Sequence, residues 1–264
     1  MSLSIPDLSL DLTLFCGQCF RWKKLENGDF YGIINDKPVT AHQDGERFTF
    51  SSPKPLNEAE IQHYFALDVD YKRIKQILRS DSVLSSAIDY ASGIRVLRQP
   101  FFETLCSFII SQNNNITRIT GIIERLCELC GELKDEIRLF PTPQALSALT
   151  LEDLAPIRSG FRAKYLIDAS VCCQNGLISE DFLKYAPLED ARRLLMTIKG
   201  VGPKVADCVL LFGCERYEAF PRDVWINRAM AALYPNGLPD FALPYVGIAQ
   251  QYIFHYARTS GIFK

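Results

Sequence analysis

The stretch that decides the fold is KGVGPKVADC, residues 199–208. Gly200 and Gly202 permit backbone conformations that are closed to other residues, which is typical of a tight turn. Pro203 suits the first turn of a helix, and the apolar run at residues 205–212 extends that helix. The stretch therefore predicts a glycine turn that leads directly into an apolar helix.

Another helix is predicted before the turn. Residues 187–198 begin with a proline and acidic residues and then place apolar side chains at helical spacing, and this helix is expected to end at Lys199 and Gly200. The resulting helix-hairpin-helix, about residues 190–213, presents backbone N–H groups that can hold a phosphodiester. A P-loop is excluded, because the glycines stand two positions apart and Val205 follows the lysine where a metal-binding hydroxyl is needed.

Lys204 has two interpretations. The helix that it opens is apolar enough to be buried, and both burial and the positive end of the helix dipole favour a neutral, nucleophilic amine. The alternative is a solvated lysine that caps a surface turn. This segment alone does not decide between them.

Asp223, in the stretch FPRDVW at residues 220–225, follows a proline and precedes another helical pattern. Aspartate is a preferred N-cap residue, which gives it a structural interpretation. A carboxylate that caps a helix can also face a cleft, and beside an amine nucleophile it could stabilise a developing oxocarbenium ion or move protons. We therefore treat Asp223 as a candidate catalytic residue.

The N-terminal part of the chain has the pattern of an antiparallel sheet. Four short segments within residues 19–52 combine β-branched and aromatic residues, and the residue pairs between them are typical of hairpin turns. The segments are FRWKKLE, DFYGIIND, KPVTAHQD and ERFTFSS, and the turn pairs are Asn27-Gly28, Asn35-Asp36 and Asp44-Gly45.

Helical spacing replaces this pattern after about residue 56 and continues to the end of the chain. We therefore predict an α+β protein with a small N-terminal antiparallel β-sheet domain and flanking helices, residues 1–85. A large all-α body with the helix-hairpin-helix, residues 86–264, is expected to follow it. The first helical segments are LNEAEIQHYFAL, DYKRIKQILRS and SVLSSAIDYAS.

Composition bounds the class of protein. The chain has 264 residues, a net charge of -2 and a pI near 6.0, which argues against a protein that coats nucleic acid through bulk positive charge. A local basic face could still bind a few phosphates. Neither a membrane span nor a secretory signal is indicated, so we expect a location inside a cell.

The nine cysteines are odd in number and scattered, which favours reduced thiols over a disulfide framework. Two C-x2-C pairs, Cys16 with Cys19 and Cys127 with Cys130, could in principle form a four-thiolate zinc or iron-sulfur site. The pairs lie far apart, however, and the second falls in a helical pattern where cysteine usually acts as a small hydrophobe. The three histidines form no ligand cluster by spacing: His42, His63 and His255.

Taken together, GVGPKVADC and the downstream PRDV resemble the catalytic helix-hairpin-helix and aspartate of base-excision DNA glycosylases. The details resemble the 8-oxoguanine DNA glycosylase/AP lyase branch. Five further motifs follow the order of that family, and together they are distributed over most of the chain. They are CGQCFRW at 16–22, FALDV at 65–69, LRQPFFETLCSFIISQNNNITRI at 97–119, GFRAKY at 160–165 and AQQYIF at 249–254.

The resemblance implies roles for the two candidate catalytic residues. Lys204 matches the Schiff-base nucleophile of the family and Asp223 its catalytic aspartate. Cys208 is four residues after Lys204, so one helix face can present both the nucleophile and a wall of the base pocket.

The resemblance also implies a pocket for a flipped base. Gly17 matches the glycine whose carbonyl reads the N7 hydrogen of oxidised guanine. Cys208 and Phe254 match the residues that sandwich the base, Gln250 matches the amide that reads its pairing edge, and Phe108 is assigned to the same pocket.

A third implied group contacts DNA. Asn113, Arg118, Phe161 and Arg162 match the residues that fill the gap in the duplex and contact the orphaned cytosine, and arginine suits paired hydrogen bonds to base edges. Buried asparagines at a helix end are the alternative for the NNN stretch. The backbone contacts are assigned to Gly200, Gly202 and Trp225.

Three positions depart from the family pattern. Phe161 stands where the eukaryotic pattern has tyrosine, Gln112 where it has serine, and Trp225 where it has a histidine that contacts phosphate. The resemblance further implies a structural monovalent or divalent cation on hairpin carbonyls; the candidates are Met196, Ile198 and Val201.

The expected function is therefore a bifunctional repair glycosylase and AP lyase that acts on 8-oxoguanine in double-stranded DNA, opposite cytosine, without a catalytic cofactor. We expect a monomer without a membrane partner, in the prokaryotic cytoplasm, or in the nucleus if the source is eukaryotic. The alternatives are an alkylated-purine glycosylase of the same superfamily, which would need no lysine, and a noncatalytic helix-hairpin-helix DNA-binding protein.

Overall fold

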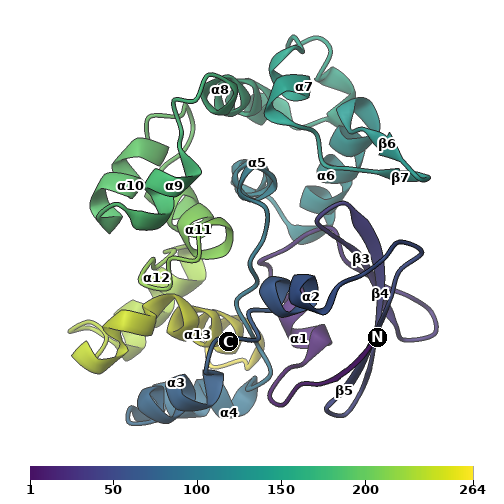
Figure 1. The fold of residues 1–264 in the computed structure, drawn as a ribbon. Coiled ribbons are helices and arrows are strands. Elements are labelled where there is room, and N and C mark those ends of the chain that lie inside the picture. The colour runs from purple at the N-terminus through teal and green to yellow at the C-terminus, as the bar shows by residue number, and fades with distance from the viewer. Residues whose placement is uncertain (264) are drawn as a thin grey trace. The chain divides into compact units, whose positions relative to one another are not determined.

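The computed structural model describes residues 1–263 (Figure 1). These residues fall into two compact units. Unit 1 comprises residues 1–18, residues 22–98 and the chain from Arg216 onward, and unit 2 comprises residues 19–21 and 99–215. The units group residues by mutual contact. The proposed domain boundary between residues 85 and 86 stays a prediction about folding domains.

Unit 1 contains the expected antiparallel sheet, in the strand order β1-β5-β4-β3-β2. Alternate side chains of β5 are buried, and Phe50 packs 5.6 Å, between ring centroids, from Phe65 just after helix α2 (Glu58–Tyr64). One face of the sheet therefore supplies the core of the unit, as the period of two requires. The strands are β1 (Ser2–Ser4), β2 (Lys23–Lys24), β3 (Phe30–Ile34), β4 (Lys37–Asp44) and β5 (Arg47–Ser51).

Two strands differ from the expectation. The segment FRWKKLE forms only the two-residue β2, because its aromatic residues are used elsewhere: the Trp22 indole donates to the Tyr64 hydroxyl at 2.8 Å. The edge strand β1 was not predicted, and it pairs with β5 in the register Leu3 to Phe48. Its three residues are too few for a periodic signal.

Most helices of unit 1 begin at side-chain caps. Asn57 and Glu60 form a reciprocal capping box at α2, and Asp70 and Asp81 cap α3 and α4, which satisfies backbone N–H groups that the helices leave unpaired. The helices are α1 (Leu10–Phe15), α2 (Glu58–Tyr64), α3 (Tyr71–Leu78), α4 (Ser82–Tyr90), α12 (Val224–Leu233) and α13 (Val246–Thr259), with a 3-10 turn η3 (Asp240–Tyr245).

Unit 2 is helical apart from a short hairpin of β6 (Leu133–Lys134) and β7 (Ile137–Arg138). The central helix α5 packs against α11, and both are buried along most of their length. The helices are α5 (Phe101–Ser111), α6 (Ile116–Cys130), α7 (Pro143–Ser147), α8 (Ala163–Gln174), α9 (Glu180–Tyr185), α10 (Leu188–Leu195) and α11 (Pro203–Gly213), with 3-10 turns η1 (Ala155–Ile157) and η2 (Gly160–Arg162).

The structure thus has the predicted order of an antiparallel sheet followed by a largely helical body. Within the described part of the chain, no helix combines the length and the apolar character that a membrane crossing demands.

Candidate functional site

The predicted helix-hairpin-helix is formed by α10, the turn that follows it, and α11. Helix α10 ends at Leu195, earlier than predicted, and the turn is closed by the Val201 N–H, which donates to the Ile198 carbonyl at 3.1 Å. Gly200 adopts φ +79°, and a Cβ at this position would lie 2.3 Å from the ring of Tyr165. A side chain is excluded there by both conformation and space.

Gly202 does not share this constraint, so only one of the two glycines that permit special conformations adopts one. Its φ is -98° and its ψ is 179°, which is ordinary extended backbone, and a Cβ would meet nothing within 4 Å. Gly202 is the N-cap of α11, and the first helical bond runs from the Ala206 N–H to its carbonyl. The N–H groups of Lys204 and Val205 therefore lack an acceptor within the helix.

Lys204 lies in the first turn of α11 and points toward α5. Its Nζ donates to the Ser111 Oγ at 3.3 Å and lies 5.0 Å from the centroid of the Phe108 ring. The Ser111 hydroxyl donates in turn to the Phe108 carbonyl at 2.8 Å, so its lone pairs are turned to the amine. Lys204 is half-buried while α11 is buried from Val205 onward, so it is neither a solvated surface lysine nor a fully enclosed one.

Phe108 is fixed beneath the lysine by other rings. It stacks on Phe212 with 5.3 Å between centroids and meets Phe20 edge-on at 5.9 Å. Cys208, one turn after Lys204, is 3% exposed. Unit 2 therefore brings together Lys204, Cys208 and Phe108, three of the predicted site residues.

Sequence reasoning missed an ion pair in this hairpin. Asp207 on α11 accepts from the Arg192 Nε on α10 at 2.8 Å, and burial raises the pKa of its carboxyl. The signal was an acid within an otherwise apolar helix, because aspartate is rarely buried unless it is paired. The pair ties the two helices of the hairpin together.

Asp223, in unit 1, is the N-cap of α12, as the structural interpretation predicted. Its Oδ1 accepts from the Ile226 N–H at 2.8 Å, and the side chain is only partly buried. Two residues earlier, the Pro221 carbonyl accepts from the Gln250 Nε2 at 3.1 Å. The cap is thereby linked to α13.

Gly17 and Phe254, also in unit 1, lie against each other. Gly17 adopts φ +98°, and a Cβ there would lie 3.9 Å from the Phe254 Cε1. Gln250, one turn before Phe254, is 4% exposed, and its Oε1 accepts from the Gln251 Nε2 at 2.6 Å. Unit 1 thus brings together the predicted base-binding residues Gly17, Gln250 and Phe254.

The NNN stretch lies between α5 and α6 and is held by Arg162. Arg162 is 3% exposed, and its guanidinium donates to the Gln112 carbonyl, from Nε at 2.9 Å, and to the Asn113 carbonyl at 3.1 Å. Asn113 adopts φ +47° and is exposed, which does not fit the alternative of a buried asparagine. In this structure Arg162 shapes the turn, and its contact with DNA stays a prediction.

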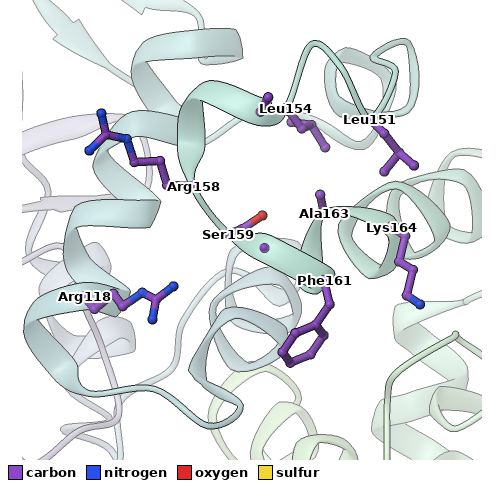
Figure 2. Close-up of a pocket in the computed structure, with 10 residues that line it drawn as sticks. Arg118, Leu151, Leu154, Arg158, Ser159, Phe161, Ala163 and Lys164 are labelled. Atoms are coloured by element: carbon purple, nitrogen blue, oxygen red, sulfur yellow. The ribbon is translucent and has the colours of Figure 1, made fainter.

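Arg118 and Phe161 are exposed and line one cavity of about 490 Å³ (Figure 2). The Phe161 ring is 50% exposed and lies 4.4 Å from the Arg162 guanidinium carbon. Trp225, in the first turn of α12, is 37% exposed. These residues have the accessibility that their predicted DNA contacts require.

The cysteines lie in the protein as reduced thiols; all nine are among the described residues. Burial raises the pKa of Cys16 to about 12 and of Cys127 to about 12, which opposes the thiolate that a metal would bind. The Cys16 thiol donates instead to the Thr13 carbonyl at 3.3 Å. Within residues 1–263, no three His, Cys, Asp or Glu side chains are grouped so as to hold a metal ion.

Comparison with known proteins identifies two consecutive domains. Residues 1–105 match the N-terminal domain of 8-oxoguanine DNA glycosylase, and residues 106–237 match the HhH-GPD superfamily of base excision DNA repair proteins. A probable N-glycosylase/DNA lyase of Methanothermobacter thermautotrophicus is 31% identical, over 99% of this chain and 97% of its own length. The N-glycosylase/DNA lyase of Saccharomyces cerevisiae is 36% identical, over 86% of this chain and 69% of its own.

Comparison with solved structures supports the same family. The 8-oxoguanine glycosylase/lyase of Clostridium acetobutylicum, in complex with double-stranded DNA containing cytosine opposite 8-oxoguanine, is 37% identical and superposes with a TM-score of 0.88. The match covers 97% of this chain and 93% of that one. Since both domains and the full length match, the chain belongs to the 8-oxoguanine DNA glycosylase/DNA lyase family of the helix-hairpin-helix superfamily.

Proposed function

We infer that the protein is a bifunctional DNA repair enzyme, which removes 8-oxoguanine from duplex DNA and then cleaves the strand. The observation that carries this function is the amine of Lys204, held by a hydroxyl and an aromatic face at the start of the helix that follows the hairpin. A lysine amine can form a Schiff base with the sugar, whereas hydrolysis of the glycosidic bond alone needs no lysine.

We propose the following course for the reaction. The Lys204 amine attacks C1′ of the damaged nucleotide, and the bond from C1′ to the base breaks, with its electron pair leaving on the base. The carboxylate of Asp223 offsets the positive charge that develops on the sugar. The attached amine loses a proton, and its lone pair then forms the C=N bond of a protonated imine as the C1′–O4′ bond breaks and O4′ takes up a proton. Proton loss from C2′ of this imine expels the 3′ phosphate by β-elimination, and hydrolysis by water then releases the lysine. These steps use only side chains of the protein and water.

The target nucleotide must leave the base stack before this chemistry, because its C1′ is unreachable inside the duplex. We propose that Gly17, Cys208, Gln250, Phe254 and Phe108 bind the extruded base. The exposed Asn113 and Phe161 would then fill the gap in the duplex. The partial burial of Lys204 and Asp223 supports this proposal, since both side chains keep a surface open to the nucleotide.

Cytosine is the proposed base opposite the lesion. Its support is Arg118, an exposed guanidinium that can pair with a base edge, and the crystallised relative from Clostridium acetobutylicum was bound to DNA with cytosine at that position. Phe161 lacks the hydroxyl of the eukaryotic tyrosine, so we expect discrimination against the other three opposing bases to rest on Arg118.

The structural cation remains a proposal for the hairpin carbonyls. The Ile198 carbonyl accepts one hydrogen bond, from the Val201 N–H, and a carbonyl oxygen has a second lone pair. Oxygen donors of this kind suit hard cations. Met196 and Val201 would supply the other carbonyls, and a bound cation would add positive charge beside a DNA phosphate.

The test is single-turnover release of base from four duplexes that carry 8-oxoguanine opposite each of the four bases. We expect release and strand cleavage, fastest opposite cytosine, and none from duplexes that carry 3-methyladenine. Release of the alkylated purine without strand cleavage would favour the alkylated-purine glycosylase. Tight binding without release of any base would favour the noncatalytic DNA-binding protein.

A further inference from the structure

A cavity in unit 2 carries more positive charge than the proposed base contacts use. It lies among η1, η2, the start of α6 and the start of α8, and has a volume of about 490 Å³ (Figure 2). Its lining includes Arg118, Arg158 and Lys164 but no acidic residue. Three cations around one cavity create a local potential that attracts an anion, although the net charge of the chain is -2.

These cations are not neutralised by the protein. Within residues 1–263, the guanidinium groups of Arg118 and Arg158 form no ion pair and no hydrogen bond, and Lys164 meets only the Tyr165 ring, at 5.2 Å. By contrast, the nearby Arg125 donates to the Ile157 carbonyl at 3.0 Å. The cations of the cavity therefore keep their hydrogen-bond donors for a ligand.

Ser159 adds a buried donor in the same place. Its side chain is 1% exposed, yet its Oγ has no hydrogen-bond partner among the described residues. Figure 2 shows this oxygen directed into the space bounded by Leu154 and Ala163. A buried hydroxyl without a partner is rare in folded proteins and calls for a ligand or water.

The backbone around Ser159 favours the same kind of ligand. Arg158 adopts φ +57° and Gly160 φ +63°, while Ser159 between them is right-handed helical. Alternation of left-handed and right-handed residues turns successive N–H groups toward one side and forms an anion-binding concavity. The hydroxyl, the N–H groups and the cations therefore all favour an anionic ligand.

We propose that this cavity binds one phosphate group and that the DNA backbone supplies it. The proposal rests on the function proposed above, in which the enzyme acts on duplex DNA. Leu151 and Leu154 form an apolar part of the lining, against which a deoxyribose can lie, so the site suits a phosphodiester better than a free phosphate ion. Arg158, Ser159 and Lys164 would then position the strand, whereas Arg118 reads the base.

The DNA arm of the test measures binding to a duplex with a tetrahydrofuran abasic-site analogue at several salt concentrations. The slope of log K against log salt is negative, and loss of one phosphate contact reduces its magnitude by roughly 0.9. We expect this fall for the double variant Arg158→Ala/Lys164→Ala. The matched control is Arg73→Ala, which removes an exposed charge on α3 and should leave the slope unchanged.

The free-ion arm titrates inorganic phosphate and follows the backbone amide NMR signals. We expect saturable shifts at residues 158–164 in the wild type and their loss in Ser159→Ala. The control is Ser170→Ala, which removes another buried hydroxyl, one that already donates to the Ile167 carbonyl at 2.7 Å. Ser159→Ala removes an unpaired group, so it should fold at least as well as the wild type and serves if the double variant does not fold.

An unchanged salt slope in the variants overturns the proposal. If phosphate still shifts the amides, the site takes a free ion and the assignment to DNA is wrong; if it does not, there is no anion site. Borohydride trapping of the wild type on an 8-oxoguanine duplex is run in parallel. Its failure would count against the proposed function and not against this site, because the salt slope needs no chemistry.

Discussion

Two lysines of the same hairpin differ in their surroundings. Lys199 has a side chain that is 77% exposed and forms an ion pair with Asp168 at 3.1 Å, which is how a surface lysine is usually placed. Lys204, five residues later, instead contacts the Ser111 hydroxyl and the Phe108 ring. Among residues 1–263 no carboxylate pairs with the Lys204 amine, so no ion pair has to be broken before it attacks the sugar.

Asp223→Asn separates the two interpretations of the aspartate. Asparagine caps a helix about as well as aspartate, so the bond to the Ile226 N–H and the stability of α12 should persist. The negative charge is lost, so we expect base release to slow by about 10²- to 10⁴-fold while binding to an abasic-site analogue changes little. Single-turnover rates and equilibrium binding measure the two quantities.

The control for that variant is Asp70→Asn, which changes the N-cap of α3 in the same way. It should leave both release and binding at the wild-type level. Equal losses of release and binding in Asp223→Asn would show that Asp223 is only a structural cap.

At the residue scale, the sequence indicates candidate site residues but not their partners. Lys204 and Asp223 stand in motifs with fixed spacing, whereas Ser111 meets Lys204 from 93 positions away, across the packing of α5 on α11. The spacing of residues within one segment cannot predict a contact with a segment that is distant in the sequence. Arg162 shows the reverse case, because its motif predicted a DNA contact and the structure shows bonds to carbonyls of the adjacent turn.

At the scale of elements, the hairpin allows its two glycines to be tested separately. A side chain on Gly200 would be strained by φ +79° and would clash with Tyr165, so Gly200→Ala should lower the free energy of unfolding by more than about 1 kcal/mol. Gly202→Ala meets neither obstacle and should fold normally. If the hairpin backbone approaches a phosphate, Gly202→Ala should nevertheless weaken DNA binding.

Thermal unfolding and binding to an abasic-site duplex measure these effects. A Gly202→Ala variant with unchanged DNA affinity would contradict the phosphate role of that position. A Gly200→Ala variant as stable as the wild type would contradict the turn geometry.

The contact between the sheet and α2 predicts a pH dependence. Glu60 belongs to the capping box of α2 and accepts from the Lys37 Nζ at 2.6 Å, and this hydrogen bond holds the pKa of the Glu60 carboxyl below its usual 4.5. A lowered carboxyl pKa stabilises the folded state above pH 4.5, and the contribution is lost as the pH falls through the lowered pKa. Glu60→Gln should therefore be less stable than the wild type at pH 7 and approach it in acid, as denaturant unfolding at both pH values would show. An equal difference at both would contradict the role of the carboxylate charge.

Elements with strong local signals were predictable. The turn pair Asn35-Asp36 and the caps of α2, α3 and α4 each depend on residues that are close in the sequence. Helix α11 is indicated by a single apolar run. The strand β1 was not predictable, because three residues carry too little pattern and their pairing depends on β5, far along the chain. Which of the two hairpin glycines adopts a left-handed conformation was not predictable either, since glycine permits a special conformation without requiring it.

At the scale of the whole molecule, the proposed site residues divide between two units that each contain distant parts of the chain. Unit 1 holds Gly17 with Asp223, Gln250 and Phe254, and unit 2 holds Lys204 with Cys208. The N-terminal and C-terminal segments of unit 1 come together only in the fold, so only the order of motifs in the family, and not local pattern, could group these residues from sequence.

The central claim is that Lys204 forms a covalent bond with the sugar. The most direct measurement is borohydride reduction during incubation with an 8-oxoguanine duplex, followed by mass spectrometry of the peptide that carries the DNA adduct. We predict an adduct on Lys204 in the wild type and in Lys199→Gln, and none in Lys204→Gln. An adduct that persists in Lys204→Gln, or that maps to another lysine, would contradict the account.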